Sequence, residues 1–430
     1  MAVARFRPFR GIRFSADAVG GKAAFDGIVA PPYDVINQDA RDELLASSPY
    51  NVTRLILNPE GHDVAAKQFR DWISRGVLAR DDAPAFYLYC QDFEHNGSHR
   101  RTGIIGALHL EPFSTGVVRR HETTFAHHKQ DRLNLTEKVK ANLSPIFGLY
   151  SNAEFSPRPE RGWDSEAEVD VLHDGVRSRL WTVRDPAAVA AITAAVDERT
   201  IFIADGHHRY ETALNYFEQQ AGREPEMGRD APDDDEMPSA HVMAFLASFE
   251  DPGMIILPTH RAVANSGGMD VAAFERELAA RFEITRVRKD GDGIARLMAM
   301  LEDTPREVNA FGCALAGRDA YLLLVRPVPT TTQTGSPMAK LDVTALHSVI
   351  LGDAFTAAGG RDAKIEYSPD EHLVIRQVDD GLAQAAFLMK PMLAEQMSEI
   401  CMANELLPQK STYFYPKLLT GLVFHTLAQG

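Results

Sequence analysis

Cysteine is scarce in this chain, and its distribution excludes two classes of small structural site. Three cysteines occur in 430 residues, at positions 90, 313 and 401. An odd number without CxxC spacing argues against a disulfide framework and against a zinc ribbon. The pattern is typical of proteins of the reducing cytoplasm, and we expect a cytoplasmic location.

Long apolar runs and an excess of basic residues are also missing. No apolar stretch approaches the roughly 20 residues of a membrane helix, and the first residues lack the apolar core of a secretory signal. The formal net charge of −15 would repel a polyanion, so a nucleic-acid partner is not expected without a local basic patch. We therefore expect a soluble protein with no membrane partner. The oligomeric state stays open.

One stretch of the sequence combines a buried strand, a tight turn and the start of a helix. Residues 201–204 are apolar and rich in β-branched and aromatic types, which indicates a short buried strand. Asp205 and Gly206 form a turn signal, because glycine accepts a positive φ. The apolar residues 213, 214 and 217 then follow at helical spacing. The sequence predicts strand, turn and helix in direct succession.

Three basic or titratable side chains, His207, His208 and Arg209, begin the predicted helix. A helix N-terminus has free N–H groups and partial positive charge. Cations there destabilise the helix by roughly 0.3–1 kcal/mol each, so their clustering indicates an anion site, most simply for phosphate. The alternative is an aspartate cap followed by exposed basic residues. The buried strand and the glycine turn favour the phosphate site.

A second concentration of ionisable side chains lies within residues 116–132. Its candidate ligands are Arg120, His121, Glu122, Lys129 and Arg132. His121 and Glu122 do not begin a zinc-protease motif, because position 125 is phenylalanine where that motif needs histidine. Several histidines could still gather around a metal, so a transition-metal hydrolase stays a minor alternative.

Further candidates follow a predicted strand and a loop nearer the C-terminus. His260 and Arg261 lie just past residues 255–257, where they could complete an anion site. Lys410 precedes Ser411, but the glycines of a phosphate-binding Walker loop are missing upstream. Lys410 could reach a phosphate from a loop. For each of the three, an ordinary surface position is the alternative.

The order of predicted elements indicates an α+β protein. A hairpin is expected around Asn96 and Gly97, a strand over residues 51–57 and a final apolar helix after Lys417. Residues 219–238 form an acidic insertion that we expect to be a loop. Three segments are predicted: residues 1–102, 103–250 and 251–430.

The motif from Asp205 to Arg209 resembles that of free serine kinases in the ParB/sulfiredoxin superfamily. In that superfamily a strand, turn and helix of this kind bind nucleotide phosphates. A His-Glu pair, a helix and a proline-led apolar strand precede the motif in those kinases, and residues 121–122, 133–139 and 145–147 follow that order. This resemblance covers about residues 103–220. Nearly the whole chain also resembles domain-of-unknown-function family 1015, described as similar to those kinases. The resemblance to family 1015 extends from Ala30-Pro31-Pro32-Tyr33-Asp34 through the central motif to residues 408–416.

The resemblance implies an α+β fold with a ParB/sulfiredoxin-like central domain and α+β elaborations at both ends. It also implies a kinase that uses ATP or ADP with Mg²⁺ and phosphorylates the hydroxyl of a small metabolite, free L-serine being the first candidate. Gly206, His207, His208 and Arg209 would clamp the nucleotide phosphates. Asp205 would hold Mg²⁺ or cap the helix, and Glu122 would accept the hydroxyl proton.

Second-rank ligands for nucleotide or substrate are Arg120, His121, Lys129, Arg132, His260, Arg261 and Lys410. Two other functions stay open. The chain could be a non-catalytic nucleotide-binding switch, since the ParB relatives use bound nucleotide to switch partners. A phosphatase or metal-dependent hydrolase using the same pocket is the third possibility.

Overall fold

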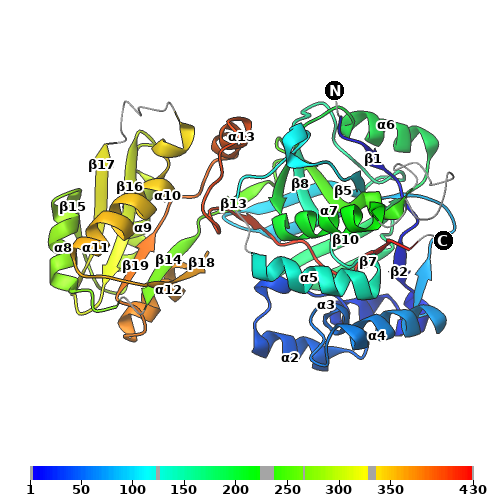
Figure 1. Cartoon of the computed structure of the whole chain (residues 1–430), viewed down its shortest axis with the longest axis horizontal. Helices are drawn as coiled ribbons and strands as arrows, with labels where there is room; N and C mark the ends of the chain where they lie inside the picture. The colour runs from blue at the N-terminus through cyan, green and yellow to red at the C-terminus, as the bar shows by residue number, and fades with distance from the viewer. Residues whose placement is uncertain (1–2, 123–125, 223–236, 265–266, 328–335, 429–430) are drawn as a thin grey trace. The chain divides into compact units, whose positions relative to one another are not determined.

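The computed structural model describes residues 3–122, 126–222, 237–264, 267–327 and 336–428. The chain is a mixed α+β protein (Figure 1) and divides into two compact units. Unit 1 comprises Met1–Arg120, Thr124–Ile255 and Pro416–Gly430, and unit 2 comprises His121–Thr123 and Ile256–Tyr415.

Unit 1 is built on one large mixed sheet. The strand order is β6-β11-β8-β12-β5-β4-β10-β9, with β1 also pairing with β5. The pairs β6/β11 and β8/β12 are parallel, and the other pairs are antiparallel. The strands are β1 (Phe6–Arg7), β4 (Phe86–Glu94), β5 (Ser98–His109), β6 (Val118–Arg119), β8 (Ile146–Tyr150), β9 (Val169–His173), β10 (Val176–Val183), β11 (Ile201–Asp205) and β12 (His241–Ser248). Two short pairs complete the unit: β2 (Ile12–Phe14) with β3 (Leu78–Arg80), and β7 (Ala141–Asn142) with β21 (His425–Thr426).

Helices cover this sheet in layers (Figure 1). Helix α7 packs on β8 and β12, α5 packs on α7, and α4 packs on α5. The helices of unit 1 are α1 (Ala16–Val19), α2 (Gln38–Ser47), α3 (Thr53–Ile56), α4 (His62–Ser74), α5 (Ala126–Val139), α6 (Pro186–Val196) and α7 (His207–Ala221). The connection between β11 and α7, Asp205 and Gly206, is half-buried.

The local predictions for unit 1 are partly confirmed. The predicted hairpin is β4/β5, with Asn96 and Gly97 both at positive φ. The strand predicted over residues 51–57 is wrong, because helix α3 occupies residues 53–56. Asn51 explains the difference: its side chain accepts from Thr53 N at 2.9 Å and donates to Gly27 O at 2.9 Å. This contact starts a turn that apolar periodicity does not reveal.

The predicted final helix is also wrong. Thr420 exchanges backbone hydrogen bonds of 2.8 and 3.2 Å with Ala30, and Phe424 exchanges two of 2.9 Å with Ile12. Leu418, Leu419, Leu422 and Val423 are buried. The C-terminal residues therefore satisfy their backbone groups by pairing with the N-terminal region of the chain, and the gain from tertiary pairing overrides helical propensity.

Unit 2 is built on a six-stranded antiparallel sheet, in which the strand order is β15-β17-β16-β19-β14-β18. Its strands are β14 (His260–Ala264), β15 (Glu283–Arg288), β16 (Val308–Leu315), β17 (Ala320–Pro327), β18 (Lys364–Ser368) and β19 (Ala385–Leu388). A separate pair joins β13 (Ile255–Leu257) and β20 (Tyr413–Tyr415). The helices are α8 (Val271–Ala279), α9 (Gly293–Glu302), α10 (Asp342–Ala345), a π-helix (Leu346–Ala354), α11 (Phe355–Ala357), α12 (Glu371–Asp379) and α13 (Ala394–Met402).

Both faces of the unit 2 sheet are buried. Phe311 and Phe387 point into one core, with α8 and the π-helix. Ala310 and Ala386, their chain neighbours, point into the other, with α9 and α12. This alternation follows the two-residue period of a strand, and it makes unit 2 a three-layer sandwich.

Other sequence-level predictions meet the structure only in part. The α+β class is confirmed. The predicted boundary between residues 102 and 103 lies inside β5, and the three-segment division stays a prediction. Most of the predicted acidic insertion, residues 223–236, lies outside the described residues.

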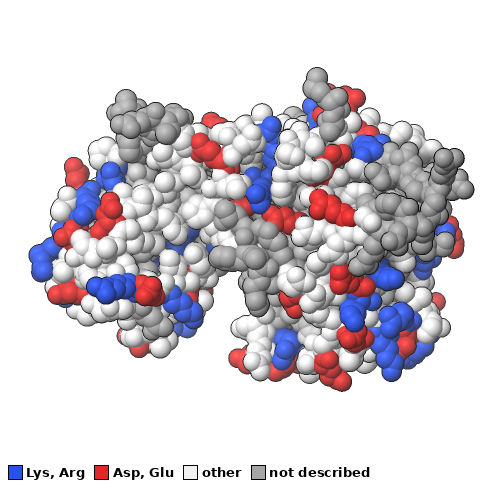
Figure 2. Space-filling view, in the orientation of Figure 1, with Lys and Arg blue, Asp and Glu red and all other residues white. Residues whose placement is uncertain are grey.

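Among the described helices, none has the length and apolar character that a membrane crossing needs. Figure 2 shows acidic and basic side chains interspersed on the face in view.

Candidate phosphate-binding turn

The predicted strand, turn and helix are present in unit 1. Strand β11 runs between β8 and β6, and Ile201–Ala204 are buried. Gly206 follows with φ of 90°, and the 15-residue helix α7 begins at His207. The apolar residues of β11 hold the turn against the core, so the start of α7 has a defined position.

Gly206 is required for two reasons. Its φ of 90° lies in the left-handed region that favours glycine. In addition, a Cβ atom at this position would lie 3.0 Å from Cζ of Arg209. The Arg209 side chain therefore folds back over the turn, and any larger residue at position 206 would push it away.

Two cations meet at the carboxylate of Asp205. Arg209 Nη2 donates to Asp205 Oδ2 at 3.0 Å, and Arg209 Nη1 donates to the carbonyl oxygen of Pro145. Lys417 Nζ lies 3.5 Å from Asp205 Oδ1. Gly206 is the N-cap residue of α7 and has no side chain with which to cap it. Asp205, the residue before it, orients two cations.

The segment that carries Lys417 is anchored by a fully buried arginine. Arg101 donates to the carbonyl oxygen of Pro416 and to the side chain of Gln91, whose amide donates to Lys417 O at 3.0 Å. The Arg101 guanidinium lies 4.9 Å from the ring centre of Phe147. Burial lowers the pKa of Arg101 to about 10, so it keeps its charge at neutral pH.

The electrostatic balance of the turn is positive. Arg101, Arg209 and Lys417 carry three positive charges. Asp205 supplies one negative charge, and both Asp251 and Asp205 interact electrostatically with Arg101. The Arg209 and Lys417 side chains are 13% and 14% exposed. His207 is buried and His208 is half-buried at the first turn of α7. A partly buried site with this balance favours an anion.

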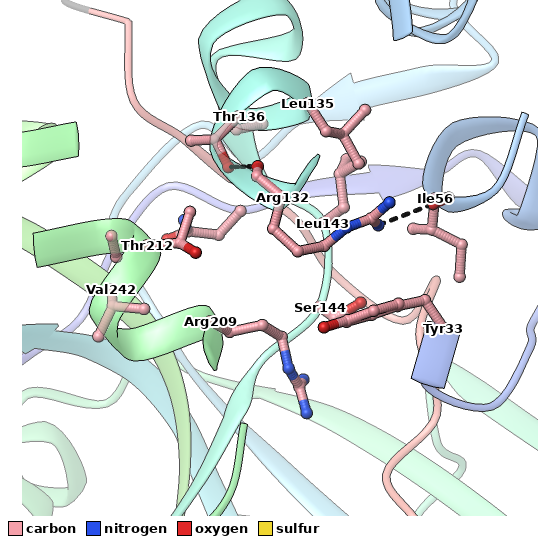
Figure 3. Close-up of a pocket in the computed structure, with 13 residues that line it drawn as sticks. Tyr33, Ile56, Arg132, Leu135, Thr136, Leu143, Ser144, Arg209, Thr212 and Val242 are labelled. Atoms are coloured by element: carbon pink, nitrogen blue, oxygen red, sulfur yellow. Dashed lines mark hydrogen bonds between the residues drawn. The ribbon is translucent and has the colours of Figure 1, made fainter. Parts of the chain in front are cut away.

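A cavity of about 60 Å³ lies beside the turn in unit 1 (Figure 3). Arg209 and Thr212 of α7, Arg132 of α5, Tyr33 and Ser144 are among its lining residues. Thr212 is 3% exposed, and its Oγ1 atom has no hydrogen-bond partner among the described residues. A buried hydroxyl without a partner is costly unless a ligand or water satisfies it.

Arg132 has a structural role at the wall of this cavity. Its Nη1 atom donates to Ile56 O at 2.9 Å, and its guanidinium lies 4.3 Å from the ring centre of Tyr33. Burial raises the pKa of Tyr33, against the opposing charges of Arg209 and Arg132. Arg132 Nε also donates to Asp131 Oδ2 at 2.8 Å, so its charge is balanced by a neighbouring carboxylate. Arg132 therefore joins α5 to the N-terminal residues and serves as a structural part of the cavity wall.

His121 and Glu122 belong to unit 2, where Glu122 binds the loop around Lys410. Glu122 Oε1 accepts from Ser411 N at 3.0 Å, from Thr412 N at 3.2 Å and from Thr412 Oγ1 at 3.2 Å. Oε2 accepts from Lys410 N at 3.3 Å. His121 is fully buried, with Nε2 2.8 Å from Thr412 Oγ1. The structure thus brings together three of the predicted residues, His121, Glu122 and Lys410.

The remaining second-rank candidates have other surroundings. Arg120 pairs with Glu211 of α7 at 2.5 Å and lies over the ring of Phe113. His260 and Arg261 lie in the interior of unit 2. Lys129 belongs to α5, and its side chain lies outside the described part of the chain. Lys417, Arg101 and Thr212 could not be found from the sequence, because their roles depend on contacts between distant segments.

Residues 6–344 match a family described as a protein of unknown function, DUF1015. The chain belongs to this family. The family resemblance stated from the sequence is therefore confirmed for this DUF1015 protein. Its comparison with curated proteins finds no match.

Solved structures similar to this DUF1015 chain are distant from it. A conserved hypothetical protein from Pyrococcus furiosus has a TM-score of 0.34 and 12% identity, covering 70% of this chain and 89% of that one. A free serine kinase in complex with AMP has a TM-score of 0.33 and 11% identity, covering 69% and 83%. SbnI with a C-terminal truncation, from Staphylococcus aureus, has a TM-score of 0.34 and 9% identity, covering 74% and 85%. We rest no argument on likenesses this weak, so function is argued from the site itself.

Proposed function

We propose that this DUF1015 protein is a nucleotide-dependent kinase that phosphorylates the hydroxyl of a small metabolite, with free L-serine as the first candidate. The observation that carries the proposal is the pairing of Arg209 and Lys417 with Asp205 at the start of α7, beside a cavity. The motif resemblance to free serine kinases supports the choice of phosphoryl transfer. The ParB/sulfiredoxin-like assignment of this core and a cytoplasmic location belong to the same proposal.

The turn would bind the phosphates of ATP or ADP. The backbone N–H groups at the start of α7 and the guanidinium of Arg209 are suitable donors to phosphate oxygens. Of the five N–H donors of Arg209, described contacts use one toward Asp205 and one toward Pro145. Asp205 holds the cations in position before the nucleotide arrives, which lowers the cost of ordering them.

In the proposed reaction, the acceptor hydroxyl oxygen bonds to the terminal phosphorus while the bond from that phosphorus to the nucleotide oxygen breaks. The hydroxyl proton passes to a base, for which Glu122 stays the predicted residue. Catalysis of phosphoryl transfer rests on positioning and charge neutralisation more than on covalent chemistry by the protein. The cationic turn is suited to that task.

Magnesium fits the side chains of this turn poorly. The Asp205 carboxylate already has two cationic neighbours, at 3.0 and 3.5 Å, and a metal ion there would be repelled by both. In the part of the chain that the structure describes, no group of three His, Cys, Asp or Glu residues could hold a metal. We therefore propose that Mg²⁺ accompanies the nucleotide, with phosphates and water as its ligands.

A non-catalytic nucleotide-binding switch is the second candidate, and the surroundings of Glu122 favour it. This carboxylate accepts four hydrogen bonds from residues 410–412. A carboxylate offers about four lone pairs, so these donors leave little room for a substrate hydroxyl. The same contacts are those expected if Glu122 only holds the loop in place.

Phosphorus NMR distinguishes the two candidates. The purified chain is incubated with Mg²⁺ and either ATP or ADP, together with L-serine and a panel of other hydroxyl-bearing metabolites. A kinase produces a new phosphomonoester signal that requires one acceptor, with matching loss of the terminal nucleotide phosphate. Nucleotide binding by calorimetry without any such product in the panel supports the switch.

A further inference from the structure

Unit 2 contains a cavity of its own, of about 40 Å³. Its walls come from the ends of β14 and β19, from the residues before α10, and from α13. The charged residues that line it are Arg261, Arg306, Lys340, Lys390 and Asp342. Four cations thus face one carboxyl group.

Three of these cations contact backbone carbonyl groups. Arg261 donates to Thr259 O and, at 3.3 Å, to Lys410 O. Lys390 Nζ lies 3.2 Å from Pro305 O, and Arg306 donates to Pro391 O at 2.9 Å. Carboxylates act on them electrostatically: Asp342 interacts with Lys390 and Arg306, and Glu122 interacts with Arg261.

Two of the three are deeply buried. Arg261 is 1% exposed and Lys390 is 7% exposed. Burial lowers the pKa of Arg261 to about 10 and lowers the pKa of Lys390. Burying charge is expensive when the opposite charge nearby is too small to balance it. Four cations and one carboxyl group, Asp342, line the cavity, so it has an excess of positive charge that an anion would neutralise.

An uncharged donor completes the cavity. Thr259 lines it and is 4% exposed, and its Oγ1 atom has no hydrogen-bond partner among the described residues. A buried hydroxyl in this state is unusual, because nearly all such groups are satisfied in native proteins. An oxygen ligand in the cavity would satisfy it.

We propose that this cavity binds the oxyanion group of a small metabolite, either a carboxylate or a phosphate, with Thr259, Arg261 and Lys390 as principal ligands. The volume fits such a group, since one water needs only about 10–15 Å³ on the same measure. The site is separate from the nucleotide turn proposed for unit 1, and its residues all belong to unit 2.

Methionine methyl NMR gives a local readout of this site. Met389 and Met392 line the cavity, whereas Met243 lies in β12 of unit 1. The full chain labelled at methionine methyl carbons is titrated with inorganic phosphate and separately with acetate, and signals are assigned with conservative Met→Leu variants. We expect saturable shifts of Met389 and Met392 with at least one anion. The anion that produces them identifies phosphate or carboxylate as the recognised group.

The deciding variant is Thr259→Val, which keeps the shape of the side chain and removes the hydroxyl. Because that hydroxyl has no partner, the variant should fold as stably as the parent. It should bind the anion roughly threefold to tenfold more weakly, the loss expected for one hydrogen bond. Thr53→Val is the matched control, since Thr53 is also fully buried with an unpartnered hydroxyl but lines neither cavity.

The result is independent of the kinase proposal. Thr212→Val should leave the Met389 and Met392 titrations unchanged, because Thr212 belongs to the cavity of unit 1. Absence of any saturable shift with both anions, or equal affinity in Thr259→Val and the parent, would overturn the proposed oxyanion site whether or not the chain binds nucleotide.

Discussion

Lys417 Nζ lies 3.5 Å from Asp205 Oδ1, although 212 residues separate the two along the chain. Arg209 Nη2 donates to the other carboxylate oxygen, Asp205 Oδ2, at 3.0 Å. One aspartate therefore positions a cation from the helix that follows it and a cation from the C-terminal segment. The anion affinity of the turn should depend on both cations.

The variants Arg209→Ala and Lys417→Met should each weaken nucleotide binding by about 1.5–3 kcal/mol, the size of a charge-assisted hydrogen bond. His207→Ala is predicted to act in the same range. Calorimetry with ADP on folded protein measures the change. Lys67→Met, an exposed lysine of α4, is the control. Unchanged affinity in both Arg209→Ala and Lys417→Met would place the phosphate site elsewhere.

Gly206→Ala should destabilise the protein and displace Arg209. The left-handed φ costs an alanine about 1–2 kcal/mol, and the new Cβ would meet Arg209 Cζ at 3.0 Å. Gly175→Ala has a similar φ of 75° with nothing within 4 Å of the new atom, so it reproduces the strain alone. Urea unfolding should show a loss in both variants, while nucleotide affinity should fall only in Gly206→Ala. Equal affinity in the two would show that the position of Arg209 does not matter.

Glu122→Gln tests the predicted base. If Glu122 accepts the hydroxyl proton, turnover on the identified acceptor should fall at least about a hundredfold while nucleotide affinity stays unchanged. The control is Glu405→Gln, which alters a carboxylate of unit 2 that also accepts hydrogen bonds, from Ser336 Oγ and Met338 N. Turnover within threefold of the parent in Glu122→Gln would leave this residue the role of holding residues 410–412.

Stability should fall as the pH is lowered, and His260 should contribute to the fall. Burial lowers the pKa of His260 to about 4, from an ordinary 6.5. Between these values the unfolded chain binds a proton that the folded chain does not, so stability present above pH 6.5 is lost as the pH approaches 4. One such residue adds about 1.4 kcal/mol per pH unit to the slope.

His260→Asn should flatten that slope, because an asparagine oxygen can still accept from Met389 N, which lies 3.0 Å from His260 Nδ1. The control is His372→Asn, since the His372 side chain is 62% exposed. Unfolding should be measured by circular dichroism and not by tryptophan fluorescence. The three tryptophans, at positions 72, 163 and 181, all lie in unit 1, whereas His260 lies in unit 2. Equal slopes in His260→Asn and the parent would mean that His260 does not titrate as described.

The strand, turn and helix from Ile201 to Ala221 could be predicted because all of their signals are local. An apolar strand, a glycine with the required freedom and a helical apolar period lie next to one another in the sequence. The hairpin at Asn96 and Gly97 was predictable for the same reason. Residues 51–57 were not, because Asn51 binds a carbonyl group more than twenty residues away.

Sequence alone determined the family, the α+β class and the cationic turn at residues 205–209. Only the tertiary structure decided that Lys417 joins this turn, that Glu122 binds the backbone of residues 410–412, and that Thr212 and Thr259 line separate cavities. The physical reason is the range of the interactions. Backbone conformation follows largely from neighbouring residues, whereas the partner of a buried charge or hydroxyl is set by which distant segments pack together. The C-terminal residues show this most clearly, because pairing with Ala30 and Ile12 keeps them extended where their own apolar pattern predicts a helix.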